Sequence, residues 1–244
     1  MLAAGNTYPY TCNPDDVWKS IQIDREGYFF IDVQARGYYP RYALKQMERE
    51  GTMPIMEDGD QELLKDNTVD FISFSYYSSR CTSADPDMNK QTEGNVFATL
   101  KNPYLKASEW GWQIDPQGLS FLMKELYERY EKPLFIVENG IGIDEKLDNG
   151  KVYDDERIEY YQKHITSLKC AVEHDGVDLM GYLAWSPIDF LSSHKEMRKR
   201  YGFVYVNRGF EDLLDLARYK KKSFYWYKKV IATNGENLQN DIEY

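Results

Sequence analysis

The chain has 244 residues, of which 42% are hydrophobic, so it can bury a sizeable core and is not a short disulfide-stapled peptide. Its 40 acidic residues exceed its 30 basic residues and give a formal net charge of −10. A chain this acidic is a poor candidate for nonspecific binding to nucleic acid or to anionic membrane surfaces, and no apolar run approaches the length of a membrane span.

Cysteine and histidine are too sparse to indicate a metal centre or a disulfide framework. The three cysteines, Cys12, Cys81 and Cys170, lie far apart, and neither a Cys-x-x-Cys pair nor a His-x-x-x-His spacing occurs. We therefore expect no bound metal. We also expect a cytoplasmic protein, because few cysteines in an odd number fit a reducing compartment.

Short apolar strands alternate with amphipathic helices along the chain. Strands are predicted at residues 69–75, 133–137 and 179–185, with a candidate fourth strand at residues 1–4. Helices are predicted at residues 116–130 and from Asp154 or Asp155 onward, because apolar residues recur there at helical spacing. The predicted core stripe of the second helix consists of Ile158, Tyr161, Ile165, Leu168 and Val172.

The remaining elements are predicted near the C-terminus, as a hairpin-like segment at residues 202–207 and a helix near residues 222–233. Other residues are assigned to long loops, among them residues 78–108. Strand, helix and strand in this order predict consecutive βαβ units on a parallel sheet, which occur in doubly wound sheets and in (β/α)8 barrels. The number of strands is that of half a barrel.

The most specific local pattern is Glu138, which directly follows a buried strand and precedes Asn139 and Gly140. Catalytic groups of parallel α/β folds lie at the C-terminal ends of strands. A lone glutamate at a strand end is more often a cap or an ion-pair partner, so its position alone leaves both interpretations open.

Five motifs in the expected order resemble glycoside hydrolase family 1, over about residues 8–235. The first is the Phe-Ile-Val-Glu-Asn-Gly segment that contains Glu138. The others are DFISFSYY at 70–77, WGWQIDPQGL at 110–119, GYLAWS at 181–186, and RYG at 200–202 with KKSFYWY at 221–227. The resemblance implies the C-terminal half of a (β/α)8 barrel, covering about strands 5 or 6 to 8 with their helices.

The resemblance also implies roles for individual residues. Glu138 matches the nucleophile of a retaining β-glycosidase, and Tyr77 matches the tyrosine that donates its hydroxyl to that carboxylate. Trp185 matches the aromatic residue that lies against the sugar. Without the alignment, core packing is the better interpretation of Tyr77 and an equally good interpretation of Trp185. Hydrolysis in this family needs no metal or other cofactor.

A phosphate site is implied by a second group of residues. Ser192 stands where ordinary family members carry a sugar-binding glutamate, and Lys199 and Tyr201 follow it, as in the 6-phospho-β-glycosidases. An ammonium group and two hydroxyls suit a dianionic sugar 6-phosphate. Lys195, Arg198 and Arg200 form a predicted basic cluster beside them; as a bare charge run, such a cluster is more often a solvated loop. The implied reaction is hydrolysis of 6-phospho-β-glucosides.

Two departures from the family pattern restrict this interpretation. Ser75 replaces the usual asparagine near Tyr77, and the Asn-Glu dipeptide of the family acid/base motif does not occur. Retention requires two carboxylates, and Asp115 and Asp189 are both expected to be structural. We therefore expect residues 1–244 to form a single partial barrel domain without the N-terminal half.

Three hypotheses follow for the chain. It is the C-terminal half of a 6-phospho-β-glucosidase and inactive alone; or it is a phosphosugar-binding or assembly half that needs a separate N-terminal half or self-association; or it is a non-catalytic α/β protein that reuses the fold. The exposed edges of a half barrel favour association. The retained Glu138, Tyr77 and phosphate residues make the third hypothesis the weakest.

Overall fold

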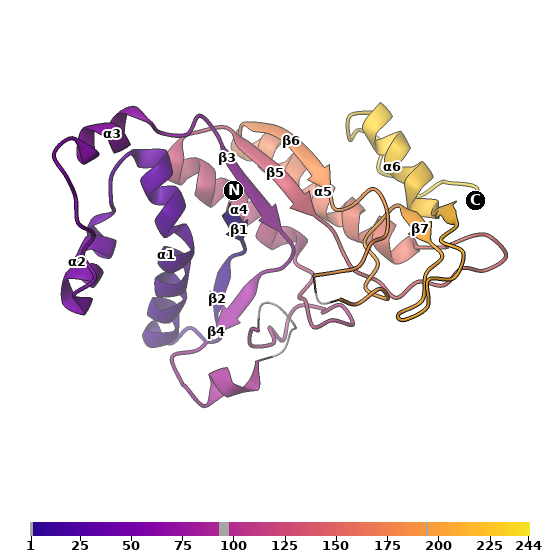
Figure 1. Cartoon of the computed structure of the whole chain (residues 1–244), viewed down its shortest axis with the longest axis horizontal. Helices are drawn as coiled ribbons and strands as arrows, with labels where there is room; N and C mark the ends of the chain where they lie inside the picture. Colours follow the sequence, from indigo (N-terminus) through magenta and orange to yellow (C-terminus); the bar gives the residue numbers. More distant parts are fainter. Residues whose placement is uncertain (1, 93–97, 194) are drawn as a thin grey trace.

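A four-stranded parallel sheet forms the centre of the molecule (Figure 1). The computed structural model describes residues 2–92, 98–193 and 195–244. The order β1–β3–β5–β6 is made by strands Leu2–Ala4, Ile72–Tyr76, Leu134–Asn139 and Leu179–Ala184. The predicted α/β class and all four predicted strands are therefore confirmed, including the candidate strand at the N-terminus.

Two helices, α4 (Pro116–Tyr130) and α5 (Asp155–Asp175), cover one face of this sheet. Leu119 and Leu122 of α4 and Ile158 of α5 are fully buried in the core that the helices share with the strands. Val172 is 36% exposed, so its predicted place in the core is wrong. The neighbouring Ala171 takes the buried position, because the last core-facing step of α5 spans three residues from Leu168 rather than four.

The region between β1 and β3 is helical, and its assignment to a long loop is wrong. It contains α1 (Pro14–Arg36), α2 (Arg41–Glu50) and α3 (Asp60–Asp66). The apolar pattern of α1 is weak because several of its buried positions are polar. Asp32, for example, accepts hydrogen bonds from the Arg129 guanidinium and from the hydroxyls of Tyr42 and Tyr130.

Two small sheets and one further helix complete the chain. Strands β2 (Thr7–Pro9) and β4 (Arg80–Thr82) pair in parallel, and β7 (Val204–Val206) pairs with β8 (Arg218–Lys220) in antiparallel fashion. The segment predicted as hairpin-like, residues 202–207, contains only β7, and its partner β8 lies further along the chain. The predicted C-terminal helix is present as α6 (Lys222–Ala232). The predicted loop at 78–108 contains β4 and the short 3-10 helix Met88–Gln91, and its residues 93–97 lie outside the described residues.

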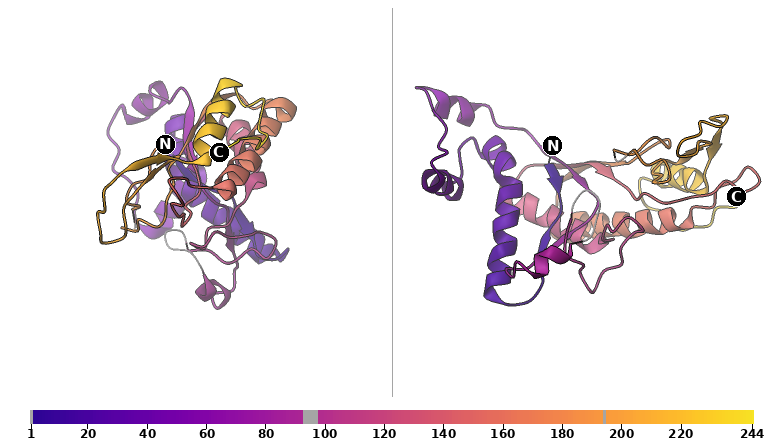
Figure 2. Two further views of the ribbon diagram at one scale, coloured as in Figure 1. Left: turned by 90° about the vertical axis from the view of Figure 1, so that its right-hand side faces the viewer. Right: turned by 60° about the horizontal axis from the view of Figure 1, so that its bottom comes forward.

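The molecule is elongated, with α1, α2 and α3 at one end and α6 at the other (Figure 2). Strands β1 and β6 form the two edges of the central sheet, and Met180 and Leu183 of β6 are 59% and 51% exposed. None of the helices in the described ranges is long and apolar enough to cross a membrane. The three cysteines are free thiols, and no group of His, Cys, Asp and Glu within these ranges could hold a metal.

Candidate active site

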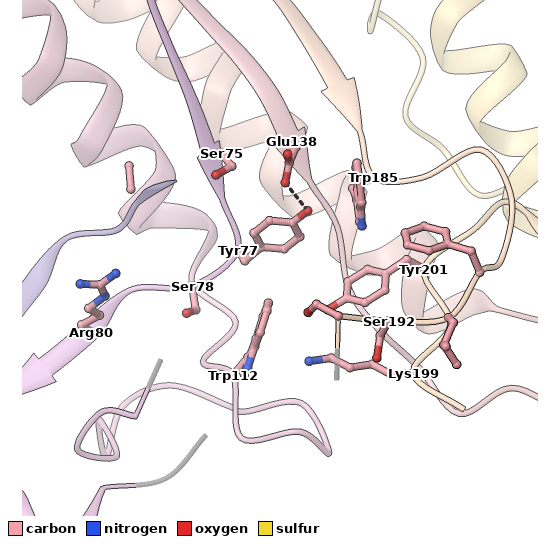
Figure 3. Close-up of a pocket in the computed structure, with 14 residues that line it drawn as sticks. Ser75, Tyr77, Ser78, Arg80, Trp112, Glu138, Trp185, Ser192, Lys199 and Tyr201 are labelled. Carbon is pink, nitrogen blue, oxygen red and sulfur yellow. Dashed lines mark hydrogen bonds between the residues drawn. The ribbon is translucent and has the colours of Figure 1, made fainter. Parts of the chain in front are cut away.

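A cavity of about 510 Å³ opens at the C-terminal ends of the sheet strands, within the size range of small-ligand sites (Figure 3). Tyr77 directly follows β3, Glu138 lies at the end of β5, and Trp185 directly follows β6. The complete lining consists of Ala4, Ser75, Tyr77, Ser78, Arg80, Trp112, Glu138, Trp185, Phe190, Leu191, Ser192, Ser193, Lys199 and Tyr201. All six predicted site residues therefore line one cavity.

A β-bulge turns Glu138 toward this cavity. In β5, Leu134 and Ile136 face the helices and are fully buried, so strict alternation would place Glu138 on the same side. The register between β3 and β5 shifts instead, so that Phe74 pairs with Ile136 and Ser75 pairs with Glu138. The extra residue, Val137, re-phases the strand, and Glu138 shares the pocket side with Ser75.

The carboxylate of Glu138 is held from the adjacent strand. The Tyr77 hydroxyl donates to Glu138 Oε2 at 2.9 Å, as Figure 3 shows. Burial, and next the nearby carboxylate, raise the pKa of Tyr77 far above its ordinary value, so the hydroxyl remains a donor. This charge-assisted hydrogen bond fixes the orientation of the carboxylate.

Trp185 and Ser192 border the opposite side of the cavity (Figure 3). The Trp185 amide donates to the Asn139 carbonyl at 2.8 Å, which ties the end of β6 to the end of β5. Its ring meets Phe190 edge to face, with centroids 5.5 Å apart. Ser192 Oγ accepts a hydrogen bond from the Glu196 amide at 3.2 Å. Its hydroxyl hydrogen remains a donor.

Lys199 and Tyr201 reach the cavity from the same stretch of chain. Positions 199 and 201 both line the cavity, whereas Arg200 between them pairs with the buried Asp189. Lys199 is 2% exposed, and its burial lowers its pKa to about 8. Its Nζ lies 3.8 Å from the ring centroid of Trp112. Burial raises the pKa of Tyr201, which therefore stays protonated.

A buried network of charges lies behind this segment. The Arg157 guanidinium donates to the carbonyls of Ile141, Arg200 and Tyr201 at 2.7, 3.0 and 2.9 Å, and it pairs with Glu145 and Asp154. The ionic side chains of the network are at most 5% exposed; they are Arg157, Arg200, Lys221, Glu145, Asp154 and Asp189. With three cations and three anions, the network compensates its own charge and anchors the backbone between Lys199 and Tyr201.

The predicted basic cluster does not assemble at the cavity. Arg200 points into the network, where it pairs with Asp189 and donates to two backbone carbonyls. Arg198 is exposed and pairs with Glu196, and Lys195 is also exposed. The cluster prediction is wrong because each basic side chain goes to a different place: Arg200 is neutralised by the buried Asp189, and Arg198 is neutralised by Glu196 at the surface. Of the basic residues at positions 195, 198, 199 and 200, only Lys199 lines the cavity.

Asp115 and Asp189 have structural contacts, as expected. Asp115 caps α4 by accepting from the Gly118 amide at 2.8 Å, and it also accepts from the Tyr8 hydroxyl. Asp189 accepts from Lys221 and the Gly202 amide within the buried network. Glu138 is the only carboxylate among the described residues that line the cavity.

Trp112 is the clearest pocket residue to which sequence reasoning assigned no role. It lies between Tyr77 and Lys199, and its ring meets the Tyr77 ring at 5.5 Å and an angle of 74°. The available signal was the Trp-Gly-Trp turn before α4, where Gly111 has φ of +76°. Arg80 and Ser78 were also missed, because they lie in a segment assigned to a loop.

The arrangement combines three chemical capacities in one cavity. An oriented carboxylate faces aromatic walls, and an ammonium group with two hydroxyls stands at the other side. A carboxylate of this kind can attack an electrophilic carbon, aromatic rings suit the apolar faces of a sugar, and the remaining groups suit an oxyanion.

Comparison with known proteins gives consistent relatives. A sequence model of "Glycosyl hydrolase family 1" matches residues 1–236. "6-phospho-beta-glucosidase AscB" of Escherichia coli strain K12 is 54% identical over 241 residues, which are 98% of this chain and 50% of that protein. "Phospho-cellobiase" of Klebsiella oxytoca is 51% identical over 98% of this chain and 52% of that protein.

The fold is similar to a solved structure, "Family 1 b-glucosidase from Thermotoga maritima", with a TM-score of 0.80 and 29% identity. That match covers 96% of this chain and 50% of the solved chain. The chain thus spans about half the length of the relatives it matches, as a partial barrel does.

Proposed function

Because the chain belongs to glycosyl hydrolase family 1, we propose that it forms part of an enzyme that hydrolyses 6-phospho-β-glucosides with retention at the anomeric carbon. We assign residues 1–244 to one partial domain, with β1, β3, β5 and β6 as the last four strands of a (β/α)8 barrel. The observation that carries the proposal is the Tyr77–Glu138 pair in the same cavity as Ser192, Lys199 and Tyr201.

Glu138 is the nucleophile of the proposed reaction. One carboxylate oxygen attacks the anomeric carbon, the bond from that carbon to the aglycone oxygen breaks, and a covalent glycosyl-enzyme ester forms. Tyr77 donates to Oε2 and orients the carboxylate before the attack. Trp185 covers one face of the sugar ring.

The 6-phosphate is bound at the other side of the cavity. The Lys199 ammonium group supplies positive charge, and the hydroxyls of Ser192 and Tyr201 supply neutral donors. The names of the relatives, a 6-phospho-β-glucosidase and a phospho-cellobiase, support a phosphorylated β-glucoside as the substrate. Such a substrate fits the cytoplasmic location expected from the few cysteines.

A complementary barrel half supplies the second carboxylate in this proposal. Retention needs two carboxyl groups about 5–5.5 Å apart, and Glu138 is the only carboxylate among the described lining residues. The chain also spans about half the length of its relatives. Without an acid/base, the chain alone forms the ester with an activated leaving group and does not release the sugar.

The test is release of nitrophenolate from p-nitrophenyl β-glucoside 6-phosphate by the purified chain. We expect at most one equivalent per chain, with the sugar phosphate attached to the peptide that contains Glu138 in mass spectrometry. The Glu138→Gln variant should release none. Steady turnover by the chain alone would refute the assignment of an incomplete site. Failure to bind the phosphorylated glucoside, measured by calorimetry, would refute the phosphate site.

Association with a complementary half is the second part of the proposal. Edge strands β1 and β6 and the exposed Met180 and Leu183 favour a partner that completes the sheet. Coexpression with the N-terminal half of the Escherichia coli relative should give a one-to-one complex with steady turnover. If the purified chain is a stable monomer and does not bind that half, this part of the proposal is wrong.

A further inference from the structure

The indole ring of Trp112 lies at one edge of the cavity, below Tyr77 and beside the end of the Lys199 side chain in the view of Figure 3. On one side, its ring meets the Tyr77 ring edge to face at 5.5 Å, and Tyr77 donates to Glu138. On the other side, the Lys199 Nζ lies 3.8 Å from its centroid. Trp112 therefore contacts both the residue that orients the carboxylate and the ammonium group.

Among the aromatic rings of the described residues, Trp112 is the one whose centroid lies nearest the Lys199 ammonium group. The same Nζ lies 5.6 Å from the Trp110 centroid and 5.8 Å from the Tyr201 centroid. Indole attracts a cation more strongly than the other aromatic side chains, and the attraction grows when water is excluded. Lys199 is 2% exposed, so the indole face replaces part of its lost hydration.

The ring is attached to a rigid part of the backbone. The Trp112 carbonyl accepts from the Ser108 amide at 2.8 Å, and its own amide is 3.3 Å from Ser108 Oγ. The next residue, Gln113, is buried and bonds to the Ser79 carbonyl and the Asn102 amide. The main chain that carries the indole is therefore held by the turn that precedes α4.

We infer that Trp112 is a positioning residue for phosphate recognition, because its indole face holds the charged Lys199 ammonium group at the pocket wall. This inference rests on the proposed function and extends it with a residue that selects for the phosphorylated sugar. Holding the ammonium group in place lowers the cost of ordering a long flexible side chain when the phosphate binds.

The electrostatic consequence is a change in the titration of Lys199. Burial lowers its pKa to about 8, and a cation–π contact opposes that shift by favouring the charged form. The described titratable or charged groups around it are Tyr77, Glu138, Tyr201 and Arg80 of the cavity lining. Its neighbour Arg198 is exposed and pairs with Glu196.

The first experiment follows the side-chain carbons of the lysines by NMR across pH 6 to 11, and a Lys199→Met variant identifies the Lys199 signal. Trp112→Leu should lower the pKa of Lys199 by about half a unit to one unit. Trp112→Phe should restore part of the difference. The matched control is Trp110→Leu, the same change on the more distant ring, which should leave the value within about 0.2 units. An equal pKa in Trp112→Leu and the unaltered protein would overturn the inference.

The second experiment measures binding of phenyl β-glucoside and of its 6-phosphate by calorimetry at pH 7. Trp112→Leu should weaken binding of the phosphorylated ligand about 10-fold more than binding of the unphosphorylated one. Equal weakening of both ligands would show that Trp112 is only a wall of the cavity and would overturn the inference. If the unaltered chain binds neither ligand, the proposed function fails, while the NMR titration still decides whether Trp112 holds Lys199.

Discussion

The two faces of the central sheet are built from the same strands but have opposite chemistry. On the covered face, Asn139 is fully buried and all its polar atoms are satisfied: Oδ1 accepts from Tyr182, and Nδ2 donates to the Tyr76 carbonyl and the Tyr160 hydroxyl. On the pocket face, the adjacent Glu138 has one described partner and opens toward the cavity. Neighbouring residues of one strand thus have different roles: Asn139 stabilises the fold, and Glu138 faces the cavity.

This division predicts that changes on the covered side alter unfolding and that changes on the pocket side alter binding. The largest effect is expected for Arg157→Met. It removes a fully buried guanidinium and leaves Glu145 and Asp154 with fewer partners, so the free energy of unfolding should fall by about 3–5 kcal/mol.

Urea unfolding followed by circular dichroism measures this loss. Arg198→Met is the matched control, because that arginine is exposed and its pair with Glu196 should contribute less than about 1 kcal/mol. Similar unfolding midpoints for the two variants would contradict the importance of the network.

A second effect on the covered side depends on pH. His164 of α5 is fully buried, its Nδ1–H donates to the Tyr160 carbonyl at 2.8 Å, and burial lowers its pKa to about 4. Between about pH 6.5 and 4 the unfolded chain binds a proton that the folded chain does not. Stability contributed by this group is therefore present above pH 6.5 and is lost as the pH falls, by up to about 3 kcal/mol.

Unfolding free energies at pH 4, 5, 6 and 7 test this dependence. His164→Gln should show a shallower decline than the unaltered chain, whereas His174→Gln, at an exposed position of the same helix, should not. If the unfolding free energies of all three proteins depended on pH in the same way, protonation of His164 would not be coupled to unfolding.

The smallest effect on stability is expected on the pocket side, for Gly142→Ala. An added Cβ would lie 2.5 Å from Lys199 Cγ and 3.1 Å from Tyr201 Cζ, so both phosphate-site side chains must move. Affinity for a sugar 6-phosphate should fall about 10-fold, while the free energy of unfolding should fall by only about 1 kcal/mol.

Gly27→Ala is the control for this substitution, because an added Cβ there meets no atom within 4 Å. It lies inside α1 and should leave ligand affinity unchanged while stabilising the helix slightly. Unchanged affinity in Gly142→Ala would show that Lys199 and Tyr201 tolerate displacement.

Sequence predicts those parts of the fold in which apolar residues recur at the spacing of a strand or a helix. The strands around Ile72, Leu134 and Leu179 and the helix with Leu119 and Leu122 were recognisable because burial selects apolar side chains at regular steps. Helix α1 was not predicted for the opposite reason, because it buries polar residues such as Asp32 in specific hydrogen bonds. Its asparagine cap, N-terminal proline and C-terminal Gly37 were the remaining signals.

The candidate site was predictable as a set of residues but not as a geometry. Strand-end position and family resemblance pointed to Glu138 and Tyr77, which the structure brings within 2.9 Å. The bulge at Val137 was not predictable, because it changes the face of Glu138 without changing its position in the sequence. The interaction of Lys199 with Trp112 joins segments 87 residues apart, and no local pattern encodes such a contact.

The placement of the side chains from position 199 to position 201 has a consequence for how selectivity can change. Arg200 and the carbonyls that Arg157 binds fix the main chain, whereas the flanking side chains point away from that anchor into the cavity. A combinatorial library confined to positions 199 and 201 would therefore vary the charge of the proposed ligand site while the anchored main chain stays in place.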